Sequence, residues 1–186
     1  FPLSIIATRL DLIHFRTGFD FITWSVFLAI GLFLIGTIIG FVKSTSAPEL
    51  ARAARFASML SLVPILILGN QLIKIRNLPA IHNISTDVSD PPSFVKVPEL
   101  RGAAANVLDY DSEIAAIQQA AYPHIKTYQS DRDAGELFSS ALEVVNEFGW
   151  DVVSQDPSTG IIEATETTRL CGFKDDVVIR VRTSDG

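Results

Sequence analysis

The chain has 186 residues, 48% of them hydrophobic, and a formal net charge of −6. The charge is unevenly divided: residues 1–81 contain three acidic residues against seven Lys or Arg, whereas residues 82–186 contain eighteen against eight. This change of sign indicates a domain boundary. The acidic C-terminal half argues against binding to nucleic acid, because phosphate contacts need clustered Lys and Arg. Cys171 is the only cysteine, which excludes an intrachain disulfide and a multi-cysteine zinc site.

Residues 1–20 mix apolar side chains with polar and charged ones, among them Arg9, Asp11, His14 and Arg16. This composition fits an interfacial segment at the level of lipid headgroups, and a plain loop is the alternative. Residues 1–6 are apolar, and we expect them to be the tail of an earlier membrane span. A cleaved signal peptide is the other explanation for a chain that begins with Phe.

Two uncharged runs predict transmembrane helices at residues 21–42 and 56–75. The first run contains 22 residues without a charged side chain. At a rise of about 1.5 Å per residue, this length is enough to cross a hydrocarbon core of roughly 30 Å. The second run is uncharged from residue 56 to residue 73, and Pro64 is expected to kink it. Membrane lipids are therefore expected to surround both helices.

Gly36 and Gly40 form a GxxxG pair within the first predicted span. Residues four apart lie on one face of a helix, so two patches without a side chain would let another helix approach closely. We interpret Gly36 and Gly40 as a helix-packing face and as a candidate docking surface for another integral membrane protein.

Residues 43–55 form a predicted loop with three basic residues against one Glu, whereas each outer flank has two basic residues. The positive-inside rule places this loop in the cytoplasm and residues 76–186 on the opposite side. In a Gram-negative bacterium, this arrangement predicts an inner-membrane protein with a periplasmic domain. A thylakoid or another energy-transducing membrane fits the same pattern.

Residues 76–110 are rich in proline and are predicted to be extended, because proline restricts both its own backbone and that of the preceding residue. The segment also contains Ile, Val and Phe, so we expect it to wrap over the domain that follows rather than to be a free linker. The prolines are Pro79, Pro91, Pro92 and Pro98.

Residues 111–186 are predicted to form a small α+β domain with antiparallel strands. A short helix runs to Ala121, capped by Asp111 or Ser112, and a longer amphipathic helix covers residues 133–148, capped by Ser130 or Asp131. Strands are predicted at residues 150–154, 161–168 and 176–183, and the alternation in the second is typical of a half-buried strand. The chain ends in a turn sequence, residues 183–186, and a turn needs a following strand. We therefore expect the domain to be truncated at its C-terminus.

Several of these stretches resemble the DUF1499 family: IHNISTDVSDPPSF at 81–94, the Tyr122–Pro123 pair, GWDVV at 149–153, GIIEAT at 160–165 and GFKDDVVIRVR at 172–182. The resemblance covers about residues 79–186. It implies an α+β domain behind membrane spans, often three, in bacteria and chloroplasts. It also implies a further strand and a terminal helix, and it carries no established activity or catalytic residues.

For each candidate chemical site, a structural role explains the residues better than metal binding or catalysis does. His82, Asp87 and Asp90 match no known metal loop, and turn formation by Asp87, Ser89 and Asp90 is the favoured interpretation. Cys171 has only three candidate bases in the chain, and no pattern places one beside it. These bases are His14, His82 and His124.

The last predicted strand offers two further candidates. Asp175 and Asp176 are adjacent, so their side chains would point to opposite faces of a strand and would not pair for acid–base catalysis. Arg180 and Arg182 share one face and are expected to pair with Glu163 or Glu166 on the neighbouring strand. A carboxylate or phosphate group of a ligand is the alternative partner for these two arginines.

The sequence thus predicts a non-catalytic integral membrane protein without a metal or a cofactor. The favoured hypothesis is an auxiliary or structural subunit whose helices dock on a larger membrane assembly, such as a respiratory or photosynthetic complex. The alternative hypothesis is a membrane-anchored domain that binds a small ligand or a lipid.

Overall fold

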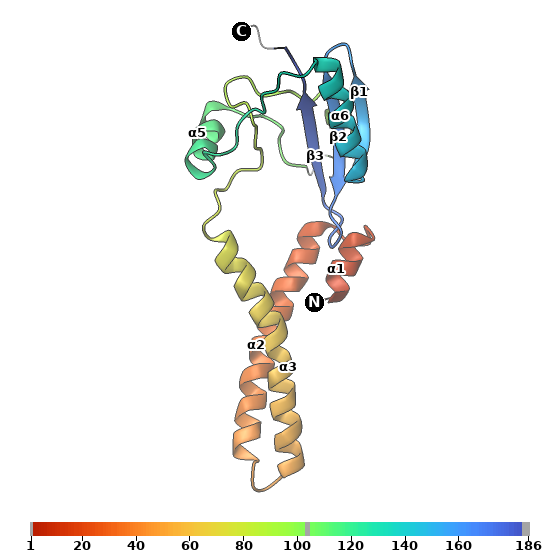
Figure 1. Cartoon of the computed structure of the whole chain (residues 1–186). Helices are drawn as coiled ribbons and strands as arrows, with labels where there is room; N and C mark the ends of the chain where they lie inside the picture. The colour runs from red at the N-terminus through yellow and green to blue at the C-terminus, as the bar shows by residue number, and fades with distance from the viewer. Residues whose placement is uncertain (1, 103–104, 184–186) are drawn as a thin grey trace. The chain divides into compact units, whose positions relative to one another are not determined.

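The computed structural model describes residues 2–102 and 105–183 (Figure 1). The chain divides into two compact units, one formed by residues 1–78 with 169–172 and the other by residues 79–168 with 173–186. We describe each unit by itself. The turn expected at residues 183–186 lies largely outside the described residues.

The first unit contains three helices, α1 at Pro2–Arg9, α2 at Phe15–Val42 and α3 at Pro48–Ile75. Helix α2 begins before the uncharged run, because His14 caps it by accepting a hydrogen bond from the Arg16 N–H at 3.3 Å. Helix α3 begins inside the predicted basic loop, with Pro48 in its first turn, where a missing N–H costs nothing. Pro64 lies inside α3, and the helix continues through it.

Helices α2 and α3 lie side by side (Figure 1) and pack together through small residues. Gly36 and Gly40 are buried on α2. A Cβ atom on Gly36 would lie 2.8 Å from the carbonyl oxygen of Ala54, and one on Gly40 would lie 2.7 Å from Cγ of Arg55. Helix α3 of the same chain therefore occupies the glycine face, which corrects the expectation that this face docks on another protein.

Polar contacts support this close approach of the two helices. The Oγ of Ser58 lies 3.2 Å from the carbonyl oxygen of Phe33 on α2, and Arg55 donates from Nη2 to the carbonyl oxygen of Gly40 at 2.7 Å. Arg55 thus satisfies a carbonyl in the last turn of α2, where a cation is also favourable for the helix dipole. Both helices are long and apolar enough to cross a membrane, and large apolar side chains such as Trp24 and Phe56 are exposed on them.

The second unit is the expected α+β domain. It contains the helices α4 at Val97–Leu100, α5 at Ser112–Ala121 and α6 at Ala134–Glu147, and the strands β1 at Asp151–Asp156, β2 at Ile161–Thr167 and β3 at Lys174–Arg180. The three strands form an antiparallel sheet in the order β1-β2-β3, with a register shift between Val152 and Ser154. This arrangement confirms the predicted fold class.

Local sequence signals determine both longer helices of this unit. Asp111 caps α5 by accepting from the N–H groups of Glu113 and Ile114, as predicted. Asp133 caps α6 in the same way, so the prediction of Ser130 or Asp131 as the cap was wrong. Gly149 follows α6 with a φ of +70°, a left-handed conformation that favours glycine after a helix.

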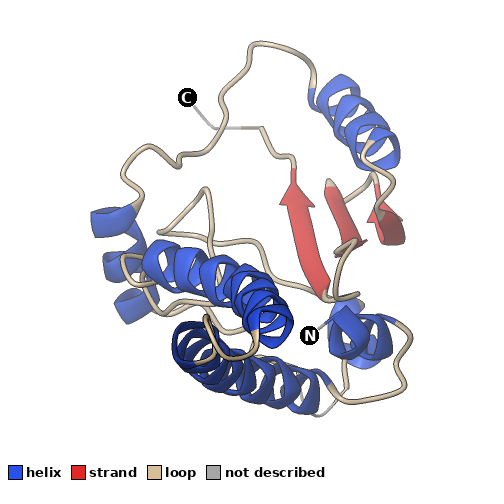
Figure 2. Cartoon of the chain, turned by 90° about the horizontal axis from the view of Figure 1, so that it is seen from below, coloured by secondary structure: helices blue, strands red, loops and turns tan. Residues whose placement is uncertain are grey.

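Helix α6 lies on one face of the sheet and forms the core with it (Figure 2). Phe138 and Val145 from α6 pack against Ile162 and Ala164 from β2. The opposite face of β2 is also covered, because Glu163 is fully buried and Thr165 is 9% exposed. The interpretation of β2 as a half-buried strand was therefore wrong, and the proline-rich segment covers its second face.

We expect Gly36→Leu to destabilise the packing of α2 on α3, because the added side chain meets the backbone of Ala54. Overpacking of this kind costs about 1–3 kcal/mol. The matched control is Gly31→Leu, because no atom lies within 4 Å of a Cβ atom built on Gly31. Thermal unfolding in detergent, followed by circular dichroism, should show a lower midpoint for Gly36→Leu only. Equal midpoints for the two variants would contradict this packing.

Candidate functional site

Two aspartates of the proline-rich segment bind two arginines at the end of β3. Arg182 donates to Oδ2 of Asp87 at 2.8 Å and also to Oδ2 of Asp90, and Arg180 donates to Oδ2 of Asp90 at 3.0 Å. Arg180 also donates to the carbonyl oxygen of Asp90. We call these four residues the Asp–Arg cluster. It ties residues 87–90 to a strand about ninety positions later in the sequence.

The second carboxylate oxygen of Asp87 organises its own loop. Oδ1 accepts hydrogen bonds from the N–H of Asp90 at 2.9 Å, the N–H of Ser89 at 3.2 Å and the hydroxyl of Ser89 at 3.0 Å. Turn formation by Asp87, Ser89 and Asp90 is therefore confirmed. Among the described residues, no group of three or more His, Cys, Asp or Glu is arranged to hold a metal ion.

Hydrogen bonds to both carboxylates favour their charged forms. The backbone N–H of Asp90, with help from Ser89 and Arg182, holds the pKa of Asp87 below its ordinary value. Hydrogen bonds from Arg182 and then Arg180 lower the pKa of Asp90. We expected Arg180 and Arg182 to pair with Glu163 or Glu166, and the structure shows that they do not. The aspartates supply the negative charge instead.

Glu163 has a different role, since its buried carboxyl group binds the backbone of the proline-rich segment. Oε2 accepts from the N–H groups of Lys96 and Val97, both at 2.8 Å. Oε1 accepts from the N–H of Lys96 at 3.2 Å and from the N–H of Val95. Three successive N–H groups at the start of α4 are thus satisfied by one side chain of the central strand.

Gln118 on α5 holds the beginning of the same segment. Its side chain is 1% exposed, accepts from the N–H of Ser85 at 2.9 Å and donates to the carbonyl oxygen of Ser85 at 2.7 Å. The hydroxyl of Tyr110 donates to the same amide oxygen at 2.7 Å. Burial raises the pKa of Tyr110, so the protonated phenol that donates this hydrogen bond is favoured further.

A third link joins β3 to the end of α4. Arg101 donates to Oδ2 of Asp176 at 2.6 Å, and the hydroxyl of Thr165 donates to Oδ1 of Asp176 at 2.6 Å. Asp175, the neighbour of Asp176, is exposed. The two carboxylates therefore have different surroundings and do not form a pair for acid–base chemistry.

A cleft of about 1280 Å³ lies between the proline-rich segment and β3. Residues 82–89, 91, 92 and 94, residues 126–130 and every residue of β3 contribute to its walls, and β3 is at the edge of the sheet. Asp87, Arg180 and Arg182 of the Asp–Arg cluster lie along these walls, and so does the Arg101–Asp176 pair. Side chains that bind the segment to the sheet therefore also shape the cleft.

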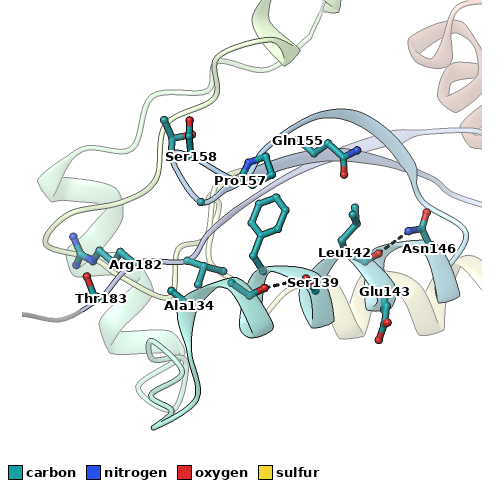
Figure 3. A pocket seen from close by; sticks show the side chains of 15 residues that line it. Ala134, Ser139, Leu142, Glu143, Asn146, Gln155, Pro157, Ser158, Arg182 and Thr183 are labelled. Carbon is teal, nitrogen blue, oxygen red and sulfur yellow. Dashed lines mark hydrogen bonds between the residues drawn. The ribbon is translucent and has the colours of Figure 1, made fainter.

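A second hollow, of about 950 Å³, lies between α6 and the turn that joins β1 to β2. Figure 3 shows two of its polar side chains, Ser139 and Asn146, hydrogen-bonded within α6. Ser139 donates to the carbonyl oxygen of Gly135 at 2.9 Å and Asn146 to that of Leu142 at 2.8 Å, both within α6. This hollow offers fewer convergent polar groups than the cleft beside β3.

Residues 83–186 match the family model described as protein of unknown function (DUF1499), which covers more than half of the chain. The chain belongs to the DUF1499 family. This assignment confirms the resemblance seen in the sequence, and the matched region contains the Asp–Arg cluster, Glu163 and the cleft. No curated protein and no solved structure matches the chain.

The remaining candidate residues, Cys171 and the three histidines, lie in different surroundings. Cys171 is a free, half-buried thiol. His124 packs edge-on against the ring of Tyr122, with ring centroids 6.4 Å apart, and His14 caps α2 in the other unit. His82 lies on the cleft wall.

Sequence reasoning missed the roles of Glu163, Gln118 and Arg101. The partners that define these roles, Ser85, Val97 and Asp176, lie between 33 and 75 positions away in the chain, so no local spacing marks them. The one available signal was the buried position of Glu163 within an apolar strand, IIEAT. A carboxyl group at such a position requires hydrogen-bond donors from elsewhere in the fold.

We expect the Asp–Arg cluster to make stability depend on pH. The pKa values of Asp87 and Asp90 are lowered in the folded domain. Their stabilising effect is therefore full above the unfolded-state pKa of about 3.9 and is lost as the pH falls through the lower folded-state values. Arg182→Gln should reduce the unfolding midpoint at pH 7, and its difference from the unsubstituted protein should close toward about pH 3.

The control is Arg169→Gln, which removes the same charge from an exposed position. Thermal unfolding across this pH range should show no such convergence for the control. A difference between Arg182→Gln and the unsubstituted protein that stays constant down to about pH 3 would contradict the assigned pairing.

Proposed function

We propose that the protein is a membrane-anchored, non-catalytic binding protein whose DUF1499 domain takes up a small molecule in the cleft beside β3. The observation that carries this proposal is the cleft itself, with a volume of about 1280 Å³. Small-molecule sites in proteins are typically clefts of about 300–1000 Å³ with a few convergent polar groups. The cleft is large enough for such a ligand and has such groups on its walls.

The walls are held in place without a ligand. The carboxyl group of Glu163, the amide of Gln118 and the Asp–Arg cluster each bind the proline-rich segment to the rest of the domain. A site that is already ordered loses less conformational entropy when it binds. This preorganisation supports a binding role more strongly than a role as a linker.

The lining combines apolar and polar surface. Phe94, Leu108 and Tyr128 lie on the walls together with the arginines of the Asp–Arg cluster. A ligand with an apolar body and a polar group would match both kinds of surface. Catalysis is not part of the proposal, because the candidate nucleophile Cys171 is not among the residues that line the cleft.

We also propose a membrane topology for the anchor. Helices α2 and α3 are the two candidate spans, and residues 43–55, which form their connection and the first turns of α3, contain three basic residues against one Glu. The positive-inside rule then favours a cytoplasmic connection and a DUF1499 domain on the opposite side of the membrane. In a Gram-negative bacterium this side is the periplasm.

The alternative proposal is an auxiliary subunit of a larger membrane assembly, such as a respiratory or photosynthetic complex. The glycine face of α2 is not available for such docking, because Gly36 and Gly40 pack on α3. Docking would have to use the exposed outer faces of the hairpin, which lipid alone can cover equally well. Purification of a stoichiometric complex in mild detergent would favour this alternative.

The binding proposal predicts that the full chain, purified in mild detergent, retains a small molecule detectable by native mass spectrometry. Val178→Trp should abolish retention, because Val178 lines the cleft from the middle of β3 and the indole would fill the space. The matched control is Val152→Trp on β1, which lines neither hollow and is 37% exposed.

The control should retain the molecule at the level of the unsubstituted protein, and circular dichroism should show both variants folded. If the unsubstituted protein retains no molecule, or if a folded Val178→Trp protein retains it unchanged, the proposal is wrong.

A further inference from the structure

The charges of residues 79–183, which comprise the described part of the second unit together with residues 169–172, are unevenly distributed between the cleft and the rest of the surface. Residues 79–183 contain seventeen Asp or Glu and eight Lys or Arg. Six of the eight basic residues line the cleft, whereas only three of the seventeen acidic residues do, among the residues that the structure describes. The six are Arg101, Lys126, Arg132, Lys174, Arg180 and Arg182. An acidic domain therefore has a cleft lined by an excess of positive charge.

Ion pairs neutralise the four arginines of the cleft, but they do not neutralise its two lysines. The arginines pair with Asp87, Asp90, Glu136 and Asp176. Lys126 and Lys174 are exposed, and neither has an ion pair within the described part of the chain. The one acidic residue of the lining outside these pairs is Asp175. The cleft thus remains positive after every pair is counted, in a region that is otherwise strongly negative.

Arg180 and Arg182 keep N–H donors that their ion pairs do not use. A guanidinium group has five N–H donors in a planar fork. The hydrogen bonds of Arg180 and Arg182 to Asp87 and Asp90 use only their Nη atoms, and within residues 2–102 and 105–183 no hydrogen bond uses either Nε. Arg182 has half of its side chain exposed. The aspartates hold the arginines in position, and the remaining N–H groups can bind an oxyanion.

We propose that the ligand of the cleft is an anion, a small molecule that bears a phosphate or carboxylate group. This proposal rests on the binding function proposed above and adds the chemical class of the ligand. The positive charge of the walls raises the local concentration of an anion, while the acidic surface elsewhere repels it. The same chemistry is found in a free phosphate or carboxylate and in the headgroup of an anionic lipid.

Isothermal titration calorimetry on the full chain in a non-ionic detergent tests this proposal with four probes. These are inorganic phosphate, citrate, short-chain phosphatidic acid, and short-chain phosphatidylcholine as the neutral control. We expect saturable binding of at least one of the three anions, weakened by added NaCl, and none of phosphatidylcholine. Tighter binding of phosphatidic acid than of phosphate would identify a lipid source, and equal or weaker binding would identify a free anion.

Variants at exposed lysines separate the cleft from general charge effects. Lys126→Gln and Lys174→Gln should each weaken anion binding about fivefold, as expected for the loss of one charge near a ligand in a high-dielectric site. Lys96→Gln is the matched control, since Lys96 is exposed in the same unit but does not line the cleft. It should leave binding unchanged, and all three proteins should unfold at the same temperature.

The absence of saturable binding for every anion would overturn the proposal, and so would an equal loss of binding in Lys96→Gln. One result would show that the cleft binds a small molecule but not an anion. A neutral molecule retained in native mass spectrometry and displaced by Val178→Trp would refute the anionic class while the binding function stands.

Discussion

The domain depends on the contact between one buried carboxyl group and three successive backbone N–H groups. Glu163 lies in the central strand of the sheet and is fully buried, a position that is costly for a carboxyl group unless its oxygens accept hydrogen bonds. The N–H groups of Val95, Lys96 and Val97 supply them. The same contact satisfies the first N–H groups of α4, so neither side can be removed without leaving the other unsatisfied.

This contact gives the proline-rich segment a fixed place on the sheet. Prolines keep the segment extended, and it has few backbone hydrogen bonds of its own. Gln118 and the Asp–Arg cluster add attachments at Ser85 and at residues 87–90. The segment thereby becomes one wall of a cleft whose other wall is β3, and the binding proposal depends on that wall being ordered.

The sequence predicted the elements of the fold better than the contacts between them. Asp111, Gly149 and the two uncharged runs are local signals, and each marks a helix or its end. Arg180 and Arg182 were also recognised, but their partners were sought on the adjacent strand. Their actual partners lie about ninety positions earlier, where only the folded chain brings them near. The glycine face was likewise visible, while its occupant, α3, was not.

The most direct test of this account is amide hydrogen exchange at Val95, Lys96 and Val97. In Glu163→Gln, the side-chain NH₂ would face backbone N–H donors, so the account predicts exchange at these amides at least about tenfold faster than in the unsubstituted protein. Glu166→Gln, an exposed position on the same strand, should leave exchange unchanged. Equally slow exchange at the three amides in Glu163→Gln would contradict the central role of this carboxyl group.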